Sequence, residues 1–94
     1  MTFRSRPLLD ACRQLSCQHC GADDGTVVAA HGVIGKGMAL KAPDHQVASL
    51  CYACHMALDQ GKDLTRDERR EMWTAAHLKT IAALFERGLL KVTK

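Results

Sequence analysis

The sequence predicts one small α+β domain that spans residues 1–94. A chain of this length is too short to hold two cores, because chains divide into domains only above roughly 250–300 residues. Two short strand-like runs lie between segments of helical periodicity, which is typical of an α+β chain. Hydrophobic residues make up 47% of the sequence, but its aromatic residues are only one Trp, one Tyr and two Phe. We therefore expect a thin core that needs further stabilisation.

The first predicted element is a short helix that begins near Ser5. Pro7 falls in the first turn, where its fixed backbone angle favours a helix start. One face of this helix is apolar and carries Leu8, Leu9, Ala11, Cys12 and Leu15. We expect the neighbouring arginines to stay in solvent, and these are Arg4, Arg6 and Arg13.

Two short strands follow the first helix. The turn-forming residues 23–25 precede an apolar run at residues 26–31, which predicts a strand that ends at His31. Three glycines then fall within residues 32–37, which indicates an irregular loop. A second apolar run predicts another strand at residues 46–50.

Two further helices complete the predicted fold. A short helix at residues 55–60 is expected to stop at Gly61. Thr65 and Glu68 form a capping-box pattern that opens a long helix, and Gly88 is placed to close it. Apolar residues recur along this helix at helical spacing, so we expect them to form a core face. They are Met72, Ala76, Leu78, Ala82 and Phe85, with Trp73, Ile81 and Leu84 widening the stripe.

The charge and the lack of long apolar runs exclude some classes of protein. A formal net charge of +3 and a pI near 8.7 permit phosphate binding without demanding it. No run approaches the roughly 18 apolar residues of a membrane span, and no signal-type apolar stretch follows the first residues. We expect no membrane partner and a cytoplasmic location. In that reducing compartment, paired cysteines are more often metal ligands or redox groups than disulfides.

Two cysteine pairs predict a structural zinc site. Cys17-x-x-Cys20 and Cys51-x-x-Cys54 each place two thiolates on a tight turn, and two such turns can close a tetrahedral shell around one Zn²⁺. The interval between the pairs is longer than in a simple zinc ribbon, so structure of its own must lie between them. A thioredoxin-like redox role is disfavoured because the chain lacks the βαβ pattern. Cys12 lies outside both pairs and is expected to be buried.

A second candidate site follows the second cysteine pair. His55 comes directly after Cys54, and a helix would stack Asp59 on the same face, four residues on. An imidazole and a carboxylate suit a divalent cation with open positions, and the carboxylate favours Mg²⁺ or Mn²⁺. Such a pair is common in helices. The position of this pair strengthens the case for a metal site, because this helix is expected to pack near the strand that ends at His31.

The order of these motifs resembles a known family. A first cysteine pair, a strand ending in His31, a glycine-rich loop, a second strand and Cys51-x-x-Cys54-His55 are similar to the zinc-bearing HNH (ββα-metal) endonucleases. Residues 35–38, 41–44 and 53–59 are more closely similar to small prophage-encoded nucleases of the YbcO-like group, related to the phage Ref recombination nuclease. The resemblance covers nearly the whole chain. It implies a zinc-stabilised HNH-like ββα-metal domain with an N-terminal helix and a long C-terminal helix.

The resemblance implies roles for the two histidines. His31 would be the general base and His55 a ligand of the catalytic metal. Phosphodiester hydrolysis needs a base that deprotonates water, which an imidazole does near neutral pH. It also needs a cation that stabilises charge on the scissile phosphate and the leaving oxygen.

Two departures from the family pattern affect the other roles. The family often has a second metal ligand just before the base, where this chain has Ala30. Asp59 would therefore serve as the second ligand. The middle Asn of the family motif falls near Asp44 and His45, so one of these would assist or orient the base.

Two groups of cations could contact phosphates. Lys36 and Lys41 lie in the glycine-rich loop, and the alternative is that they belong to an ordinary solvated loop. Arg66, Arg69 and Arg70 share one face of the last helix and could follow a DNA backbone. No base-reading helix is evident, so any cleavage is expected to be weakly sequence-specific.

Together these features predict a metal-dependent DNA endonuclease of low sequence specificity. The resemblance implies a phage or prophage protein acting in the bacterial cytoplasm on DNA recombination or processing, with a phage or host recombination protein as a candidate partner. The alternative is a non-catalytic zinc-binding module that binds DNA or a recombination or replication protein. A third alternative is a structural zinc protein with no role on nucleic acid.

Overall fold

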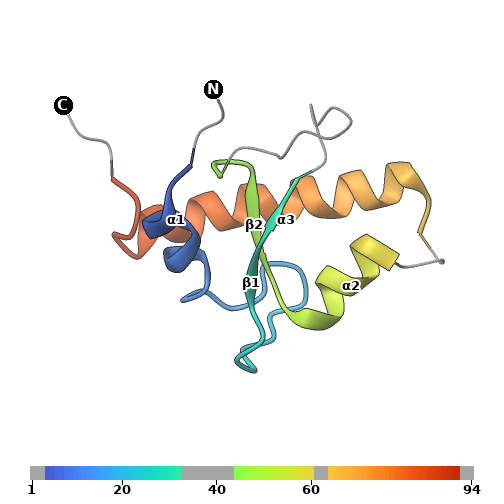
Figure 1. The fold of residues 1–94 in the computed structure, drawn as a ribbon, viewed down its shortest axis with the longest axis horizontal. Coiled ribbons are helices and arrows are strands. Elements are labelled where there is room, and N and C mark those ends of the chain that lie inside the picture. The colour runs from blue at the N-terminus through green and yellow to red at the C-terminus, as the bar shows by residue number, and fades with distance from the viewer. Residues whose placement is uncertain (1–3, 33–43, 61–63, 92–94) are drawn as a thin grey trace.

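The computed structural model describes residues 4–32, 44–60 and 64–91. Along these residues the elements are α1 (Arg6–Cys12), β1 (Val28–His31), β2 (Val47–Leu50), α2 (Tyr52–Gln60) and α3 (Arg66–Glu86). Figure 1 shows α3 running the length of the molecule, with the β1–β2 pair crossing it. Helix α1 lies toward the C-terminal end of α3, and α2 lies toward its N-terminal end. The predicted α+β class is confirmed in this form, with three helices and one two-stranded sheet in the described residues.

The two strands pair antiparallel, with Val28 opposite Leu50 and His31 opposite Val47. Every residue of β2 is buried, because elements cover both of its faces. Strand β1 begins two residues later than the sequence predicted. The reason is local, because Thr26 is held in the preceding turn by Asp24, which accepts hydrogen bonds from its amide and its hydroxyl.

The predicted start of α1 and both predicted ends of α3 are confirmed, but α1 ends at Cys12, so Leu15, expected on its apolar face, lies buried beyond the helix. Ser5 caps α1, since its hydroxyl accepts a hydrogen bond from the amide of Leu8. The Thr65 capping box is present in both directions, with both hydrogen bonds to Glu68 formed. Gly88 ends α3 at a φ of 71°, and its amide bonds back into the last turn in a Schellman arrangement.

Helix α2 begins at Tyr52, three residues earlier than predicted. The amide of His55 donates to the carbonyl of Cys51, so the second cysteine pair itself forms the first helical turn. Cys54 is therefore a helical residue rather than part of a separate knuckle. This placement sets the direction of α2, and with it the face on which the next side chains lie.

Part of the predicted core face of α3 is exposed instead. The buried residues are Trp73, Ala76, Thr80 and Leu84. Leu78 is 64% exposed and Phe85 is 46% exposed, and Ala82 lies on the same outer face. The reason is geometric, because a two-stranded sheet covers only a narrow strip of a 21-residue helix. Apolar residues outside that strip have no described element to pack against.

Strand β2 is tied to both terminal helices through buried polar groups. The amide of Ser49 donates to the Thr80 hydroxyl at 2.9 Å, and that hydroxyl donates to the carbonyl of Ala76 at 2.7 Å. The Ser49 hydroxyl donates to the carbonyl of Cys12 at 2.8 Å. Ser49 and Thr80 have no exposed surface, so none of these bonds competes with water. They fix α1 and α3 to the same point of the sheet.

We expect Thr80→Val to lower the free energy of unfolding by about 1–3 kcal/mol, because it leaves the buried amide of Ser49 without its acceptor while keeping the side-chain shape. Urea denaturation followed by circular dichroism measures the change. Thr74→Val on the same helix is the matched control, because no described hydrogen bond involves the Thr74 hydroxyl, and Thr80→Ser should recover most of the loss. An equal effect of both valine substitutions would contradict the role given to the hydroxyl.

Candidate functional site

The four predicted cysteines converge from two distant segments. Cys17 and Cys20 precede β1, Cys51 follows β2, and Cys54 lies in α2. Their sulfur atoms all lie within 4.8 Å of one another, and the Sγ atoms of Cys20 and Cys51 are 3.6 Å apart. Zn–S bonds of about 2.3 Å in a tetrahedron separate sulfurs by roughly 3.8 Å. The cluster could therefore hold a metal ion such as zinc.

The first cysteine turn is shaped by its own backbone. The amide of Gly21 donates to the carbonyl of Cys17, and Gly21 adopts a φ of 82°, which favours glycine. The amide of Cys20 donates to the sulfur of Cys17 at 3.4 Å. Burial raises the pKa of Cys17, but backbone amides that include those of Cys20 and Cys51 outweigh it and bring this pKa to about 6. The turn thus stabilises a thiolate, the form that binds metal.

The thiol of Cys54 is less acidic, and the thiol of Cys12 lies outside the cluster. Burial, together with the neighbouring cysteine sulfurs, raises the pKa of Cys54 well above its usual value. Cys12, at the end of α1, is fully buried with Val47 of β2 and Leu84 of α3, outside the four-cysteine cluster, as expected. His19 is exposed between the first two cysteines.

We expect one zinc per chain by elemental analysis, and a large loss of thermal stability when a chelator removes it, since structural zinc contributes on the order of 10 kcal/mol of folding free energy. Cys20→Ser should lose the metal. Cys12→Ser is the control that should keep it, because Cys12 lies outside the cluster. A folded, zinc-free protein with an unchanged melting temperature would contradict the assignment.

A cleft of about 540 Å³ opens between the end of β1, helix α2 and the first turns of α3. It brings together most of the residues that the sequence singled out as catalytic or DNA-binding. Its lining is Ala30, His31, His55, Leu58, Asp59, Leu64, Arg66, Arg69, Arg70 and Trp73. Titratable groups from β1 and α2 thus face a basic helix end across one concave space.

His55 and Asp59 stand one helical turn apart on α2, as predicted. His55 Nε2 lies 3.4 Å from Asp59 Oδ2. Two ligands that each bind Mg²⁺ at about 2.1 Å in adjacent positions are separated by roughly 3 Å, so this spacing fits a shared ion. Asp59 is more than half exposed, which leaves room for water or phosphate oxygens as further ligands.

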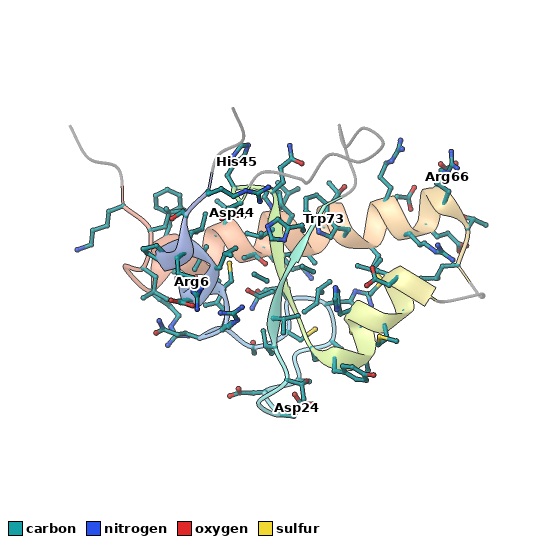
Figure 2. All side chains as sticks on the ribbon, in the orientation of Figure 1. Arg6, Asp24, Asp44, His45, Arg66 and Trp73 are labelled. Atoms are coloured by element: carbon teal, nitrogen blue, oxygen red, sulfur yellow. The ribbon has the colours of Figure 1, made fainter. Side chains whose placement is uncertain are left out.

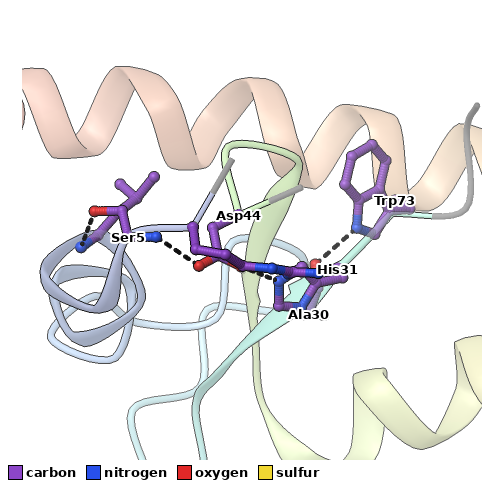
Figure 3. A network of polar contacts seen from close by, with 7 residues as sticks. Ser5, Ala30, His31, Asp44 and Trp73 are labelled. Carbon is purple, nitrogen blue, oxygen red and sulfur yellow. Dashed lines mark hydrogen bonds and ion pairs between the residues drawn. The ribbon is translucent and has the colours of Figure 1, made fainter. Parts of the chain in front are cut away.

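His31 ends β1 and contacts Asp44, which lies just before β2 (Figure 3). Asp44 Oδ1 is 2.8 Å from His31 Nε2 and 3.0 Å from Arg4 Nη1. Asp44 Oδ2 accepts a hydrogen bond from the amide of Ser5 at 2.7 Å. Arg4, which the sequence placed in solvent, is thus an ion-pair partner of a buried carboxylate.

These contacts determine which ring nitrogen of His31 can accept a proton. The hydrogen bond from His31, followed by the amide of Ser5 and by Arg4, lowers the pKa of Asp44 to about 2. Asp44 is therefore a carboxylate at neutral pH and can only accept hydrogen bonds. Nε2 of His31 must then carry the proton. This leaves Nδ1 of the neutral ring as the basic atom.

Trp73 supports the end of β1, a role the sequence reasoning missed. Its indole N–H donates to the carbonyl of Ala30 at 3.0 Å, next to His31. A Cβ on Gly32 would lie 2.5 Å from the indole ring, so only glycine allows this close approach. His77 stacks on the indole, with ring centroids 4.9 Å apart. Trp73 was assigned only to the core because a helical apolar pattern carries no signal for a hydrogen bond to a strand.

Two predicted phosphate contacts lie outside the described residues, namely Lys36 and Lys41. Asp44, one of the two residues proposed to orient the base, contacts His31. His45 is exposed beside it. Ala30 is buried and offers no ligating side chain to the cleft.

We expect Asp44→Asn to lower stability at neutral pH and to matter less in acid. The lowered pKa of Asp44 means that its carboxylate stabilises the fold above its ordinary pKa of 3.8, and that this contribution is lost as the pH falls toward about 2. Unfolding free energies of wild type and variant, measured by urea denaturation from pH 7 to pH 2, should converge across this window. Asp10→Asn, at an exposed carboxylate of α1, is the control. A constant difference at all pH values would contradict the assignment.

Comparison with known proteins shows a shared fold. No family model matches the chain, and no curated relative was found. A solved structure described as a "putative bacteriophage protein" from Escherichia coli K-12 superposes with a TM-score of 0.63 and 24% identity. The match covers 85% of this chain and 98% of that chain. No helix in the described residues is long and apolar enough to cross a membrane.

Proposed function

We propose that the protein is a metal-dependent endonuclease that hydrolyses phosphodiester bonds in DNA with low sequence specificity. One observation carries the proposal: a single cleft gathers His31, His55, Asp59 and three arginines, while a buried carboxylate holds the His31 ring. A base, a metal-binding pair and a phosphate-binding surface are the parts that this hydrolysis requires. The resemblance to HNH endonucleases supports the same assignment.

His31 would act as the general base. Its Nδ1 accepts a proton from water while the water oxygen forms a bond to phosphorus. The bond from phosphorus to the leaving oxygen breaks, and that oxygen takes up a proton to become a hydroxyl end. Asp44 stays ionised and keeps the imidazole in the required tautomer, because its oxygen accepts the Nε2 proton.

His55 and Asp59 would hold the catalytic Mg²⁺ or Mn²⁺. The bound cation supplies charge stabilisation for the phosphate and the leaving oxygen. Both side chains project into the cleft from one face of α2, so water and phosphate oxygens can complete the ligand set. The four cysteines would hold a separate structural zinc that fixes the start of this helix.

Arg66, Arg69 and Arg70 would bind the flanking phosphates. They line the cleft from α3, whereas His55 and Asp59 line it from α2. Guanidinium groups bind phosphate oxygens in pairs but carry no information about base sequence. Lys36 and Lys41, which fall between the two strands in sequence and outside the described residues, are proposed to add phosphate contacts. The protein would therefore act on DNA with little sequence preference.

The setting we propose is a phage or prophage protein in the bacterial cytoplasm, with a phage or host recombination protein as partner. The description of the E. coli structure as a bacteriophage protein supports a phage origin. The competing candidate is a zinc module that binds DNA without cutting it. Ala30 favours that candidate, because it leaves the catalytic cation one ligand short of the family pattern.

We expect His31→Ala to lower the rate of plasmid nicking in Mg²⁺ or Mn²⁺ by about 10²–10⁴-fold, because it removes the general base. Zinc content and the affinity for the second metal should stay nearly unchanged. His55→Ala and Asp59→Ala should weaken that affinity as well as the rate, as measured by calorimetric Mn²⁺ titration.

The control is His19→Gln, at an exposed histidine outside the cleft, which should nick as wild type does. Wild-type protein that binds DNA but shows no metal-dependent cleavage of supercoiled, nicked or single-stranded DNA would favour the binding module.

A further inference from the structure

We propose that Arg4 is a positioning residue of the His31 base, which it controls through the carboxylate oxygen that both residues share. The inference rests on the proposed function and extends it to a residue at the start of the chain. Arg4 contacts Asp44, the carboxylate to which His31 also donates. It acts on the base through Asp44.

The geometry places two donors on one oxygen. Asp44 Oδ1 accepts from Arg4 Nη1 at 3.0 Å and from His31 Nε2 at 2.8 Å. The amide of Ser5 donates to Oδ2, and Figure 3 shows Ser5 and His31 on either side of Asp44. Two donors fill the lone pairs of a carboxylate oxygen. The Asp44 side chain is only 5% exposed, so water does little to replace either donor. The orientation of the Asp44 carboxylate, and hence that of the His31 ring, therefore depends on both donors.

The charge of Arg4 would also act on the protonation of His31 through this shared oxygen. A buried carboxylate that contacts a histidine by itself favours the protonated ring, which cannot act as a base. A guanidinium on the same oxygen repels that second positive charge and favours the neutral ring. The two partners of the carboxylate thus compete electrostatically, although both are held by hydrogen bonds.

Other charges face His31 across the cleft. They are Asp59 and His55 on α2, and Arg66, Arg69 and Arg70 on α3. Asp59 favours the protonated ring and the arginines oppose it. Arg4 differs from all of these in contacting the oxygen to which His31 donates, so its removal changes both the charge and the hydrogen bonding of the base. Because the Arg4 side chain is 46% exposed, solvent screens its charge and moderates the effect.

The competing explanation is that Arg4 only anchors the N-terminal segment to Asp44. An anchor would change stability when removed, but it would leave the protonation of His31 unchanged. The amide of Ser5 keeps its own bond to Asp44 when the Arg4 side chain is altered, so the segment retains a second attachment. Protonation of His31 and stability can therefore be separated by experiment.

The test compares Arg4→Met with Arg4→Lys. Removal of the charge should shift the titration midpoint of the His31 ring, followed by NMR, upward by about 0.5–1 pH unit. The acidic limb of the pH profile for nicking should shift by the same amount, so that activity is lost mainly on the acid side. Arg4→Lys restores the charge and should lie close to wild type on both measurements.

Arg6→Met is the matched control. Arg6 is 82% exposed and pairs with Asp10, and Figure 2 places it on α1, apart from Asp44. Arg6→Met should change neither the titration midpoint of His31 nor the acidic limb of the pH profile for nicking. An unchanged His31 midpoint in Arg4→Met, or an equal shift in Arg4→Lys, would overturn the proposal. If wild type does not nick DNA, the proposed function fails, while the NMR titration still decides whether Arg4 controls His31.

Discussion

The convergence of four cysteine sulfurs is the constraint on which the other parts of the structure depend. It joins the turn before β1 to the end of β2 and the first turn of α2, segments about 30 residues apart. Because Cys54 is a helical residue, the cluster also sets the direction in which α2 leaves the sheet. In a thin core with few aromatic side chains, packing contributes less to holding these segments together, and a shared metal site would add to it.

The cleft combines groups that are fixed by different means. His55 and Asp59 take their positions from α2, and so from the cysteine cluster. His31 takes its position from the paired strands, from the Trp73 hydrogen bond behind it and from Asp44. The arginines of α3 belong to a third element, which Ser49 and Thr80 bind to the sheet. Rigid elements therefore position each of the proposed catalytic and phosphate-binding side chains, and this favours a precise reaction geometry.

Much of this arrangement could be predicted from local patterns. The capping box at Thr65, the glycine that ends α3 and the spacing of the cysteine pairs are signals within a few residues of one another. The bond from Arg4 to Asp44 could not be predicted, because it joins residues 40 positions apart and depends on how α1 packs against the strands. Leu78 was assigned to the core for a similar reason, since helical periodicity cannot show how wide a strip the sheet covers.

The separation of the two cysteine pairs along the chain has a consequence for biosynthesis. At roughly 5–20 residues per second, a ribosome needs about 2–7 s to make the 34 residues from Cys20 to Cys54. During this interval the first pair is a bidentate thiol site with no second pair to complete it. Trp73 and Thr80, which cover the strands, are made later still. The two thiols of the first pair must therefore stay reduced over this interval if all four cysteines are to bind one metal ion together.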